Sequence, residues 1–395
     1  MPLEAIIAGG GIAGLSTATA LAQRGWRVTV FESRGELRVT GSGIYLHNNG
    51  LTVLSELGAY DRAMSNPFLG CAWEQRDHLG QIILPGELPP SVRMVSIPRS
   101  DLMAGLEGAA RSAGVQLVTG LEVVEARADG SLIFPNGDRM QADLAIGCDG
   151  ASSRIRRSLG LELHHERSTE GALRTIVRGT QDEMAPEARG RFIENWNGKR
   201  RLLVTPMKLD EIYLALTCPA DDDEARDTRI RPCWRESFPQ WANLIDRITP
   251  DRVTWNVYSV VKCKSWSAGR ACLLGDAAHA TTPNLGQGGG MAMQNGLALA
   301  AYLANVKDRR DIPAALAAWE EAMRPLIDAS QRWASLFGEF ANIPNEVRPR
   351  IIRAVLNDAW VQSQMAVAAA SIPIARVDWS PSVAAESAAP RRSQR

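Results

Sequence analysis

The stretch LEAIIAGGGIAGLSTATALAQRGWRVTVFE, residues 3–32, decides the fold. Its apolar run to Ala8 predicts a buried strand, the glycines that follow predict a tight turn, and the Ala- and Leu-rich segment to about Gln23 predicts a helix. RVTVFE then predicts a second strand. Strand, glycine turn, helix and strand form a βαβ unit, which indicates an α/β protein with a Rossmann-type domain.

The glycine turn has the spacing GxGxxG, with Gly9, Gly11 and Gly14. Such glycines permit the tight turn and let a pyrophosphate approach the helix N-terminus, whose free N–H groups stabilise negative charge. Glu32 ends the second strand about 20 residues on, where a carboxylate accepts hydrogen bonds from both hydroxyls of an adenosine ribose. The segment predicts a dinucleotide site, but this fingerprint alone fits NAD and FAD equally.

Composition predicts a globular protein that acts on a small molecule. The chain has 395 residues, and its 44 Lys and Arg balance its 44 Asp and Glu, so no net charge draws it to nucleic acid or to an anionic membrane. Its six cysteines are scattered with no CxxC pair, which predicts no metal site and no disulfide framework and fits a reducing cytoplasm. We expect neither export nor a membrane span, since the start lacks a secretory signal and the longest late apolar run, residues 365–375, is short.

The hydrophobic pattern changes along the chain. Prolines and glycines interrupt it between residues 67 and 98, and a helix is expected from Ser100 to Ala113. Alternating runs such as EIYLALTC, with an Asn197-Gly198 turn, then predict an inserted antiparallel sheet. We expect a discontinuous dinucleotide-binding domain over residues 1–168 and 265–335, with a substrate-binding β-sheet domain inserted over residues 169–264. A C-terminal helical region is expected over residues 336–378, followed by a disordered tail over residues 379–395.

Two further segments resemble the motifs of a known family. DLAIGCDG, residues 143–150, is followed by Ser153 and Arg156, and GDAAHATTPNLGQG covers residues 275–288. With GxGxxG in front, their order and spacing resemble the class A flavoprotein aromatic hydroxylases over about residues 4–335. The resemblance implies FAD as cofactor and NADH or NADPH with O₂ as co-substrates. It also implies a Rossmann-type FAD domain, an inserted antiparallel substrate sheet and C-terminal helices.

The resemblance also implies the FAD-binding residues. Asp276 is expected to accept a hydrogen bond from a ribityl hydroxyl, the helix start after Gly286 to stabilise negative charge on the reduced ring, and Arg99 to contact FAD. The structural alternatives are a carboxylate that caps a turn, glycines that allow close packing and a surface arginine. The expected cofactor residues are Gly9, Gly11, Ile12, Ala13, Gly14, Glu32, Ser33, Arg34, Arg99, Asp149, Asp276, Pro283, Gly286, Gly288, Gly289 and Gly290.

Two local stretches resemble the hydroxypyridine branch of the family. GSGIYLHNNG, residues 41–50, is similar to the corresponding stretch of the ring-opening 2-methyl-3-hydroxypyridine-5-carboxylate oxygenases, which stand near the 6-hydroxynicotinate and salicylate hydroxylases. QGGGMAMQN, residues 287–295, departs from the common family pattern as that branch does. In the family, oxygen passes from a flavin C4a-hydroperoxide to an electron-rich ring, while the protein orients the ring and excludes water.

Four side chains are the catalytic candidates: Tyr45, Arg201, Tyr213 and His47. Arg201 and Tyr213 are a third local resemblance, because they stand on the two expected strands either side of the Pro206 turn, where the pyridine enzymes have an active-site arginine and tyrosine. Arg201 is expected to hold a substrate carboxylate or ring oxygen, and Tyr213 the phenolic group or a water. The alternative for Arg201 is an exposed hairpin pair with Arg200, and the alternative for the two tyrosines is ordinary core packing. His47 is alternatively a structural histidine. Trp73 and Trp196 are expected to pack.

The predicted function is hydroxylation of a small aromatic acid such as a hydroxypyridine carboxylate, with ring opening left open. The alternatives are salicylate or hydroxybenzoate hydroxylation, a larger polycyclic substrate, and a flavin redox protein that inserts no oxygen. No second GxGxxG follows a later strand, so no separate nicotinamide domain is expected. The family resemblance also implies a homodimer.

Overall fold

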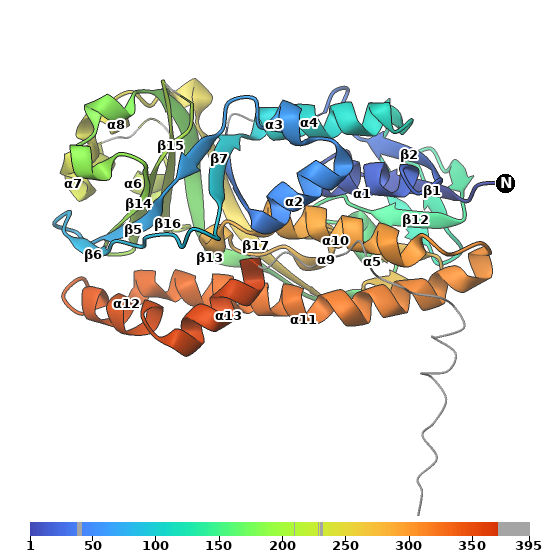
Figure 1. Cartoon of the computed structure of the whole chain (residues 1–395). Helices are drawn as coiled ribbons and strands as arrows, with labels where there is room; N and C mark the ends of the chain where they lie inside the picture. The colour runs from blue at the N-terminus through green and yellow to red at the C-terminus, as the bar shows by residue number, and fades with distance from the viewer. Residues whose placement is uncertain (38–41, 209, 228, 230–231, 370–395) are drawn as a thin grey trace, which may run out of the picture.

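The computed structural model describes residues 1–37, 42–208, 210–227, 229 and 232–369. An α/β layer and a large antiparallel sheet lie side by side, and a long C-terminal helix runs along both (Figure 1). The predicted α/β fold with C-terminal helices is confirmed. The expected disordered tail, residues 379–395, and the end of the expected helical region, residues 370–378, lie outside the described residues.

The α/β layer is built on a six-stranded sheet. Its strands, in spatial order, are β18 (Ser267–Ala268), β19 (Ala271–Leu273), β12 (Leu144–Gly147), β1 (Glu4–Ala8), β2 (Arg27–Glu32) and β8 (Gln116–Thr119). Ala8 pairs with Gly147, which pairs with Leu273, all in parallel register. The carboxyl ends of three neighbouring strands therefore meet at one edge, where loops carrying ligand-binding groups are expected in such sheets.

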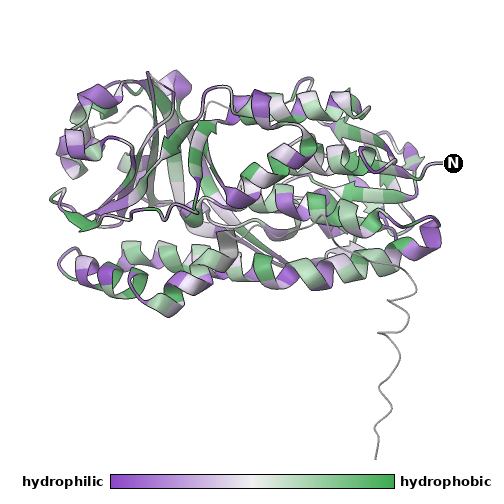
Figure 2. Cartoon of the chain, in the orientation of Figure 1, coloured by the Kyte–Doolittle hydropathy of each residue, from purple (hydrophilic) through white to green (hydrophobic). Residues whose placement is uncertain are grey.

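Helices cover the α/β sheet and bury its apolar strands. The helices packed together here are α1 (Ile12–Ala22), α4 (Arg99–Ser112) and α10 (Gly288–Leu303). The shorter helices are α2 (Asn48–Leu57), α3 (Tyr60–Ala63), α5 (Arg154–Ser158) and α9 (Asp276–His279). One small sheet consists of β3 (Gly43–His47), β7 (Met94–Pro98) and β4 (Phe68–Gly70). The other consists of β9 (Glu125–Arg127), β10 (Ser131–Ile133) and β11 (Arg139–Gln141). Figure 2 shows hydrophobic residues concentrated along the central strands.

The second sheet has seven strands. Its order is β17 (Thr254–Cys263), β13 (Glu162–Arg178), β16 (Glu211–Pro219), β15 (Arg200–Pro206), β14 (Arg191–Asn197), β5 (Ala72–Arg76) and β6 (Ile82–Leu84). Asn197 pairs with Arg200, so the predicted tight turn is present, and Gly198 adopts a φ of 56° there. Beside the sheet lie α6 (Asp223–Arg226), α7 (Pro232–Ser237) and α8 (Ala242–Ile245).

Two features of this sheet differ from the sequence pattern. β5 and β6 come from the proline- and glycine-interrupted stretch, for which the sequence pattern predicts no strand. They join the sheet because β5 pairs in parallel with β14, which is far away in sequence, and local periodicity carries no information about such a partner. β13 runs without a break through residues 168 and 169, the expected domain boundary. The division of the chain into domains stays a prediction.

The C-terminal helices form the lower layer in Figure 1. They are α11 (Ile312–Gly338), α12 (Arg348–Leu356) and α13 (Ala359–Ala369), with a 3₁₀ turn at Glu339–Asn342. The apolar positions of α11, such as Leu316, Trp319 and Met323, recur at helical spacing and are buried. Within the described residues, no helix combines the length and apolar character needed to span a bilayer.

Candidate active site

A cavity of about 760 Å³ lies between the carboxyl edge of the α/β sheet and the seven-stranded sheet. At one end its walls are backbone turns from the three glycine-containing motifs. At the other end they are side chains from β3, β5, β13, β14, β15, β16 and β17. We call these the nucleotide end and the substrate end.

The three glycines of GxGxxG have different tasks. A Cβ on Gly9, whose φ is 107°, would lie 2.3 Å from the Cys148 carbonyl oxygen, and one on Gly14 would lie 1.9 Å from the Gly9 oxygen. These two glycines therefore allow backbone to pack on backbone. Gly11 caps the N-terminus of α1, lines the cavity and has no atom within 4 Å of an added Cβ. Only Gly11 leaves room for a ligand at the helix N-terminus.

Glu32 lies beside the glycine turn, as predicted. Its carboxylate accepts hydrogen bonds from the backbone N–H groups of Gly10, at 2.9 Å, and Arg34, at 3.1 Å. These bonds fix the carboxylate at the cavity wall, with Ser33 and Arg34 next to it. The position suits acceptance of ribose hydroxyl protons.

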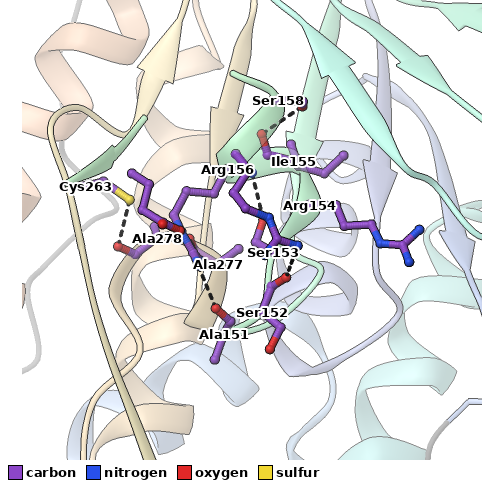
Figure 3. A network of polar contacts seen from close by, with 12 residues as sticks. Ala151, Ser152, Ser153, Arg154, Ile155, Arg156, Ser158, Cys263, Ala277 and Ala278 are labelled. Atoms are coloured by element: carbon purple, nitrogen blue, oxygen red, sulfur yellow. Dashed lines mark hydrogen bonds and ion pairs between the residues drawn. The ribbon is translucent and has the colours of Figure 1, made fainter. Parts of the chain in front are cut away.

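A buried arginine joins the second and third motifs (Figure 3). The guanidinium of Arg156, which has no exposed surface, donates to the carbonyl oxygens of Ala151 at 2.8 Å and Ala277 at 2.9 Å. The Asp149 carboxylate accepts from the Ser153 hydroxyl at 2.6 Å and from the N–H of Arg154 at 2.8 Å, so it caps α5. Both loops are thereby held as one wall of the cavity.

Asp276 and the start of α10 face the middle of the cavity. Gly275, with a φ of 64°, turns the chain so that Asp276 lines the cavity. Desolvation raises the pKa of Asp276, and Arg99 and Arg174 counteract this rise. Gly288 begins α10 with open space at its Cβ position, so the free N–H groups of the helix face the cavity.

Aromatic side chains form one wall of the substrate end. Tyr45 lies 5.3 Å from Trp73 and 6.3 Å from Tyr213 between ring centroids, and its hydroxyl is hydrogen-bonded to Thr205. Burial raises the pKa of Tyr45 and of Tyr213, so both hydroxyls stay protonated at neutral pH. Trp73, expected only to pack, lines the cavity and donates its Nε1–H to Glu194 at 3.0 Å.

Arg201 lines the cavity as half of a buried ion pair. Its Nη1 is 3.3 Å from Glu194 Oε1, and its Nη2 donates to Asn284 Oδ1 at 2.6 Å. Its guanidinium stacks over Trp196, its cross-strand neighbour, at 5.0 Å. The side chains of Arg201 and Glu194 are only 5% and 4% exposed. Arg201 is therefore no exposed hairpin residue, and its charge is offset by Glu194.

Arg174 is a second arginine that lines the substrate end of the cavity. It lies on β13, over the Tyr258 ring at 5.5 Å, and among the described residues no carboxylate forms an ion pair with it. Desolvation lowers the pKa of Arg174, but Tyr213 and Tyr258 outweigh it and raise the value, so the side chain stays charged.

The chain matches known proteins over most of its length. A model of the FAD binding domain family matches residues 3–334. The probable 2-heptyl-3-hydroxy-4(1H)-quinolone synthase AqdB2 of Rhodococcus erythropolis is 38% identical over 89% of this chain and 91% of that protein. The 2-heptyl-3-hydroxy-4(1H)-quinolone synthase of Mycobacteroides abscessus is 34% identical over 89% of this chain and 94% of that protein.

The chain belongs to the class A FAD-dependent aromatic monooxygenases. Solved structures agree with this assignment. The tetrameric form of 2-methyl-3-hydroxypyridine-5-carboxylic acid oxygenase superposes with a TM-score of 0.82 at 33% identity, covering 93% of this chain and 96% of that chain. HpxO of Klebsiella pneumoniae, complexed with FAD and uric acid, gives a TM-score of 0.75 at 25% identity, covering 92% and 93%.

The nucleotide end of the monooxygenase fits FAD. The room at Gly11 suits the pyrophosphate, and the Glu32 carboxylate suits the ribose. The cavity-lining carboxylate of Asp276 suits the ribityl chain, and the N-terminus of α10 suits the negative charge of the reduced ring. FAD is the cofactor, with NADH or NADPH and O₂ as co-substrates. Of the predicted cofactor residues, the cavity wall contains Gly9, Gly11, Ile12, Ala13, Glu32, Ser33, Arg34, Arg99, Asp149, Asp276, Pro283, Gly286, Gly288 and Gly289.

Three predicted site residues of the monooxygenase do not line the cavity. Gly14 packs on the turn, and a Cβ on Gly290 would lie 3.0 Å from the Asn49 side chain, so both serve close packing. His47 lies beside Gly286, outside the wall, and burial lowers its pKa to about 4. Arg174 and Glu194 were not singled out from the sequence, because charged residues on alternating strands usually face solvent.

Proposed function

We propose that the monooxygenase hydroxylates an N-heteroaromatic ring carrying an oxo or hydroxyl group, with a 4-quinolone preferred over a hydroxypyridine carboxylate. The observation that carries the proposal is the charge of the substrate end. Among the cavity-lining side chains of the seven-stranded sheet, Arg174 and Arg201 contribute two positive charges and Glu194 one negative charge. The net single positive charge suits a substrate with one anionic oxygen.

Arg174 is proposed to bind that ring oxygen. A charge-assisted hydrogen bond from a guanidinium stabilises an oxyanion more strongly than a neutral donor does. Negative charge on the oxygen spreads into the ring and makes the adjacent carbon more nucleophilic, which electrophilic hydroxylation requires. The hydroxyl groups of Tyr213 and Tyr258, which lie close to Arg174, are further hydrogen-bonding groups for the same oxygen or for a water that it binds.

The remaining chemistry divides between cofactor and protein. Bound FAD supplies the redox chemistry between NADH or NADPH and O₂, in which one oxygen atom enters the substrate and the other leaves as water. Tyr45 and Trp73 provide flat aromatic surface that orients the ring and excludes water. The relatives named as 2-heptyl-3-hydroxy-4(1H)-quinolone synthases support a quinolone, since that product carries a hydroxyl beside its oxo group.

Product analysis tests the proposal. Purified FAD-loaded protein is incubated with NADH or NADPH, O₂ and one of three substrates: a 2-alkyl-4-quinolone, a hydroxypyridine carboxylate or a hydroxybenzoate. The proposal expects the quinolone to accelerate NAD(P)H oxidation and to gain one oxygen atom, with product matching the NAD(P)H consumed. Hydrogen peroxide with no oxygenated product from any substrate would overturn it.

Hydroxypyridine carboxylates form the second candidate class. The structural similarity to 2-methyl-3-hydroxypyridine-5-carboxylic acid oxygenase favours them, as does the position of Arg201 near the cavity. In that case the carboxylate requires a second cation that Glu194 does not neutralise. Faster coupled turnover of the acid than of the quinolone would establish this candidate, and a further gain of one water would indicate ring opening.

A further inference from the structure

We propose that residues 334–348, between the end of α11 and the start of α12, position Arg201 at the substrate end. Arg201 lies on β15, far from this segment in sequence, and two separate chains of contacts connect them. This inference rests on the proposed function, because it assigns Arg201 to the substrate site. Residues 334–348 would then be positioning residues, which act only through Arg201.

The first connection runs through Asn284. Its Oδ1 accepts from Arg201 Nη2 at 2.6 Å, and its Nδ2 donates to the carbonyl oxygen of Ala334 on α11 at 2.9 Å. Gly338 stands against the same amide, since an added Cβ would lie 2.6 Å from Asn284 Nδ2. Asn284 is a short, buried side chain held at both ends by hydrogen bonds, and it borders the open space of the cavity, so it can be displaced without disrupting the core.

The second connection runs through Trp196. Its fully buried indole contacts two guanidinium groups, that of Arg201 at 5.0 Å and that of Arg348 at 5.8 Å from the ring centroid. Arg348 Nη2 donates to the Gly198 carbonyl oxygen at 2.6 Å in the β14–β15 turn, and its Nε donates to Phe340 at 2.8 Å. The C-terminal segment thereby holds the turn and the aromatic plate on which Arg201 rests.

The two connections constrain Arg201 from different sides. Asn284 fixes the distance of one guanidinium nitrogen from the 3₁₀ turn Pro283–Leu285 at the cavity wall, and Trp196 fixes the plane of the guanidinium. A guanidinium recognises oxygen atoms through the fixed geometry of its N–H groups, so its orientation affects which substrate pose is bound. Small displacements of such a group lower productive binding without unfolding the protein.

The substitution Gly338→Ala tests the first connection. Gly338 has helical backbone angles, φ −60° and ψ −31°, so alanine fits the backbone and slightly favours the helix, while its methyl group displaces Asn284. Gly108→Ala in α4 is the matched control. Its new Cβ meets only the flexible end of Arg62, 3.0 Å away, and Gly108 does not line the cavity.

We expect Gly338→Ala to keep its FAD content, thermal unfolding temperature and substrate-free NAD(P)H oxidation. Its KM for the aromatic substrate should rise about tenfold and its ratio of product to NAD(P)H should fall. Gly108→Ala should match the wild type. Trp196→Phe, which thins the plate under Arg201, should change the same two quantities in the same direction.

Two results would overturn the inference. One is a folded Gly338→Ala protein with wild-type KM and coupling, and the other is a parallel loss of stability, FAD and turnover, which indicates a structural role alone. If the wild type itself turns over no substrate, the proposed function fails instead. Crystal structures of wild type and Gly338→Ala then decide the inference, which requires loss of the contact between Arg201 Nη2 and Asn284 Oδ1.

Discussion

The nucleotide end and the substrate end of the cavity are built on different principles. At the nucleotide end, the groups that suit FAD are backbone N–H groups, glycines and the carboxylates of Glu32 and Asp276, and each motif is a contiguous stretch of chain. At the substrate end, side chains form the wall of the cavity, and the pairing of strands brings them together. Arg201 on β15, for example, is the register partner of Trp196 on β14 and of Thr217 on β16. Substitutions should therefore separate FAD binding from substrate recognition.

The largest expected effect is at the nucleotide end. Gly14→Ala places a methyl group 1.9 Å from the Gly9 oxygen, so the turn must open, at a cost of roughly 1–3 kcal/mol of folding stability, and FAD binding should be lost. Gly11→Ala, with open space around its Cβ, should keep the thermal unfolding temperature of the FAD-free wild type and lose FAD affinity, because the methyl group blocks the pyrophosphate. Visible absorbance and thermal unfolding measure both. Equal behaviour of the two variants would contradict the assignment of different tasks to these glycines.

At the substrate end, Arg174→Met should lower kcat/KM for the heteroaromatic substrate about 100-fold, since it removes the cation that faces the ring oxygen. FAD content should stay close to that of the wild type, because Arg174 lies on β13 and its influence on Asp276 is that of its charge, which acts there together with the charge of Arg99. Arg174→Lys, which keeps the charge, should recover part of the activity. Steady-state kinetics measure all three proteins, and wild-type kcat/KM in Arg174→Met would refute the role of this cation.

A smaller and more selective effect is expected for Glu194→Gln. The glutamine side chain keeps the size of the glutamate and an oxygen that accepts the hydrogen bond from Trp73 Nε1–H. It removes the negative charge that offsets the positive charge of Arg201. The ratio of kcat/KM for a hydroxypyridine carboxylate to that for a 4-quinolone should rise about tenfold, equivalent to about 1.4 kcal/mol. Competition between the two substrates measures this ratio. An unchanged or lowered ratio would show that the net charge does not select the substrate.

The smallest expected effect is on stability and involves His279 of the third motif. Burial lowers the pKa of His279 from 6.5 to about 4, so the folded protein keeps this histidine neutral where the unfolded chain protonates it. Stability is therefore present above pH 6.5 and is lost as the pH falls towards 4, by about 1 kcal/mol between pH 6 and 5. His279→Gln should flatten this dependence in urea unfolding curves. The same pH dependence of stability in wild type and variant would show that folding does not lower the pKa of His279 to about 4.

The same contrast explains what the sequence could predict. The predicted α/β fold, the class A family and FAD are confirmed. They could be predicted because GxGxxG and the segments at residues 143–150 and 275–288 specify local backbone turns through the spacing of their residues. Tyr45, Arg201 and Tyr213 were proposed through family resemblance, and the structure brings them to one cavity. Their catalytic roles, like the homodimer and the cytoplasmic location, stay predictions.

The substrate end could not be derived from spacing. Glu194 and Arg174 stand on different strands, and their meeting at one cavity follows from the order β13, β16, β15, β14, which crosses the sequence order. Whether such a charge is buried depends on the register of each strand, since a shift by one residue turns it to the other face. The ion pair between Glu194 and Arg201, and with it the net charge of the site, is thus a property of the folded sheet.

The charge of the bound substrate tests the account most directly. A 2-heptyl-4-quinolone labelled with carbon-13 at the oxo-bearing carbon is bound to the FAD-loaded wild type and to Arg174→Met at neutral pH, and its chemical shift is measured by NMR. The account predicts the shift of the ring anion in the wild type and that of the neutral ring in Arg174→Met. The neutral shift in both proteins would contradict it.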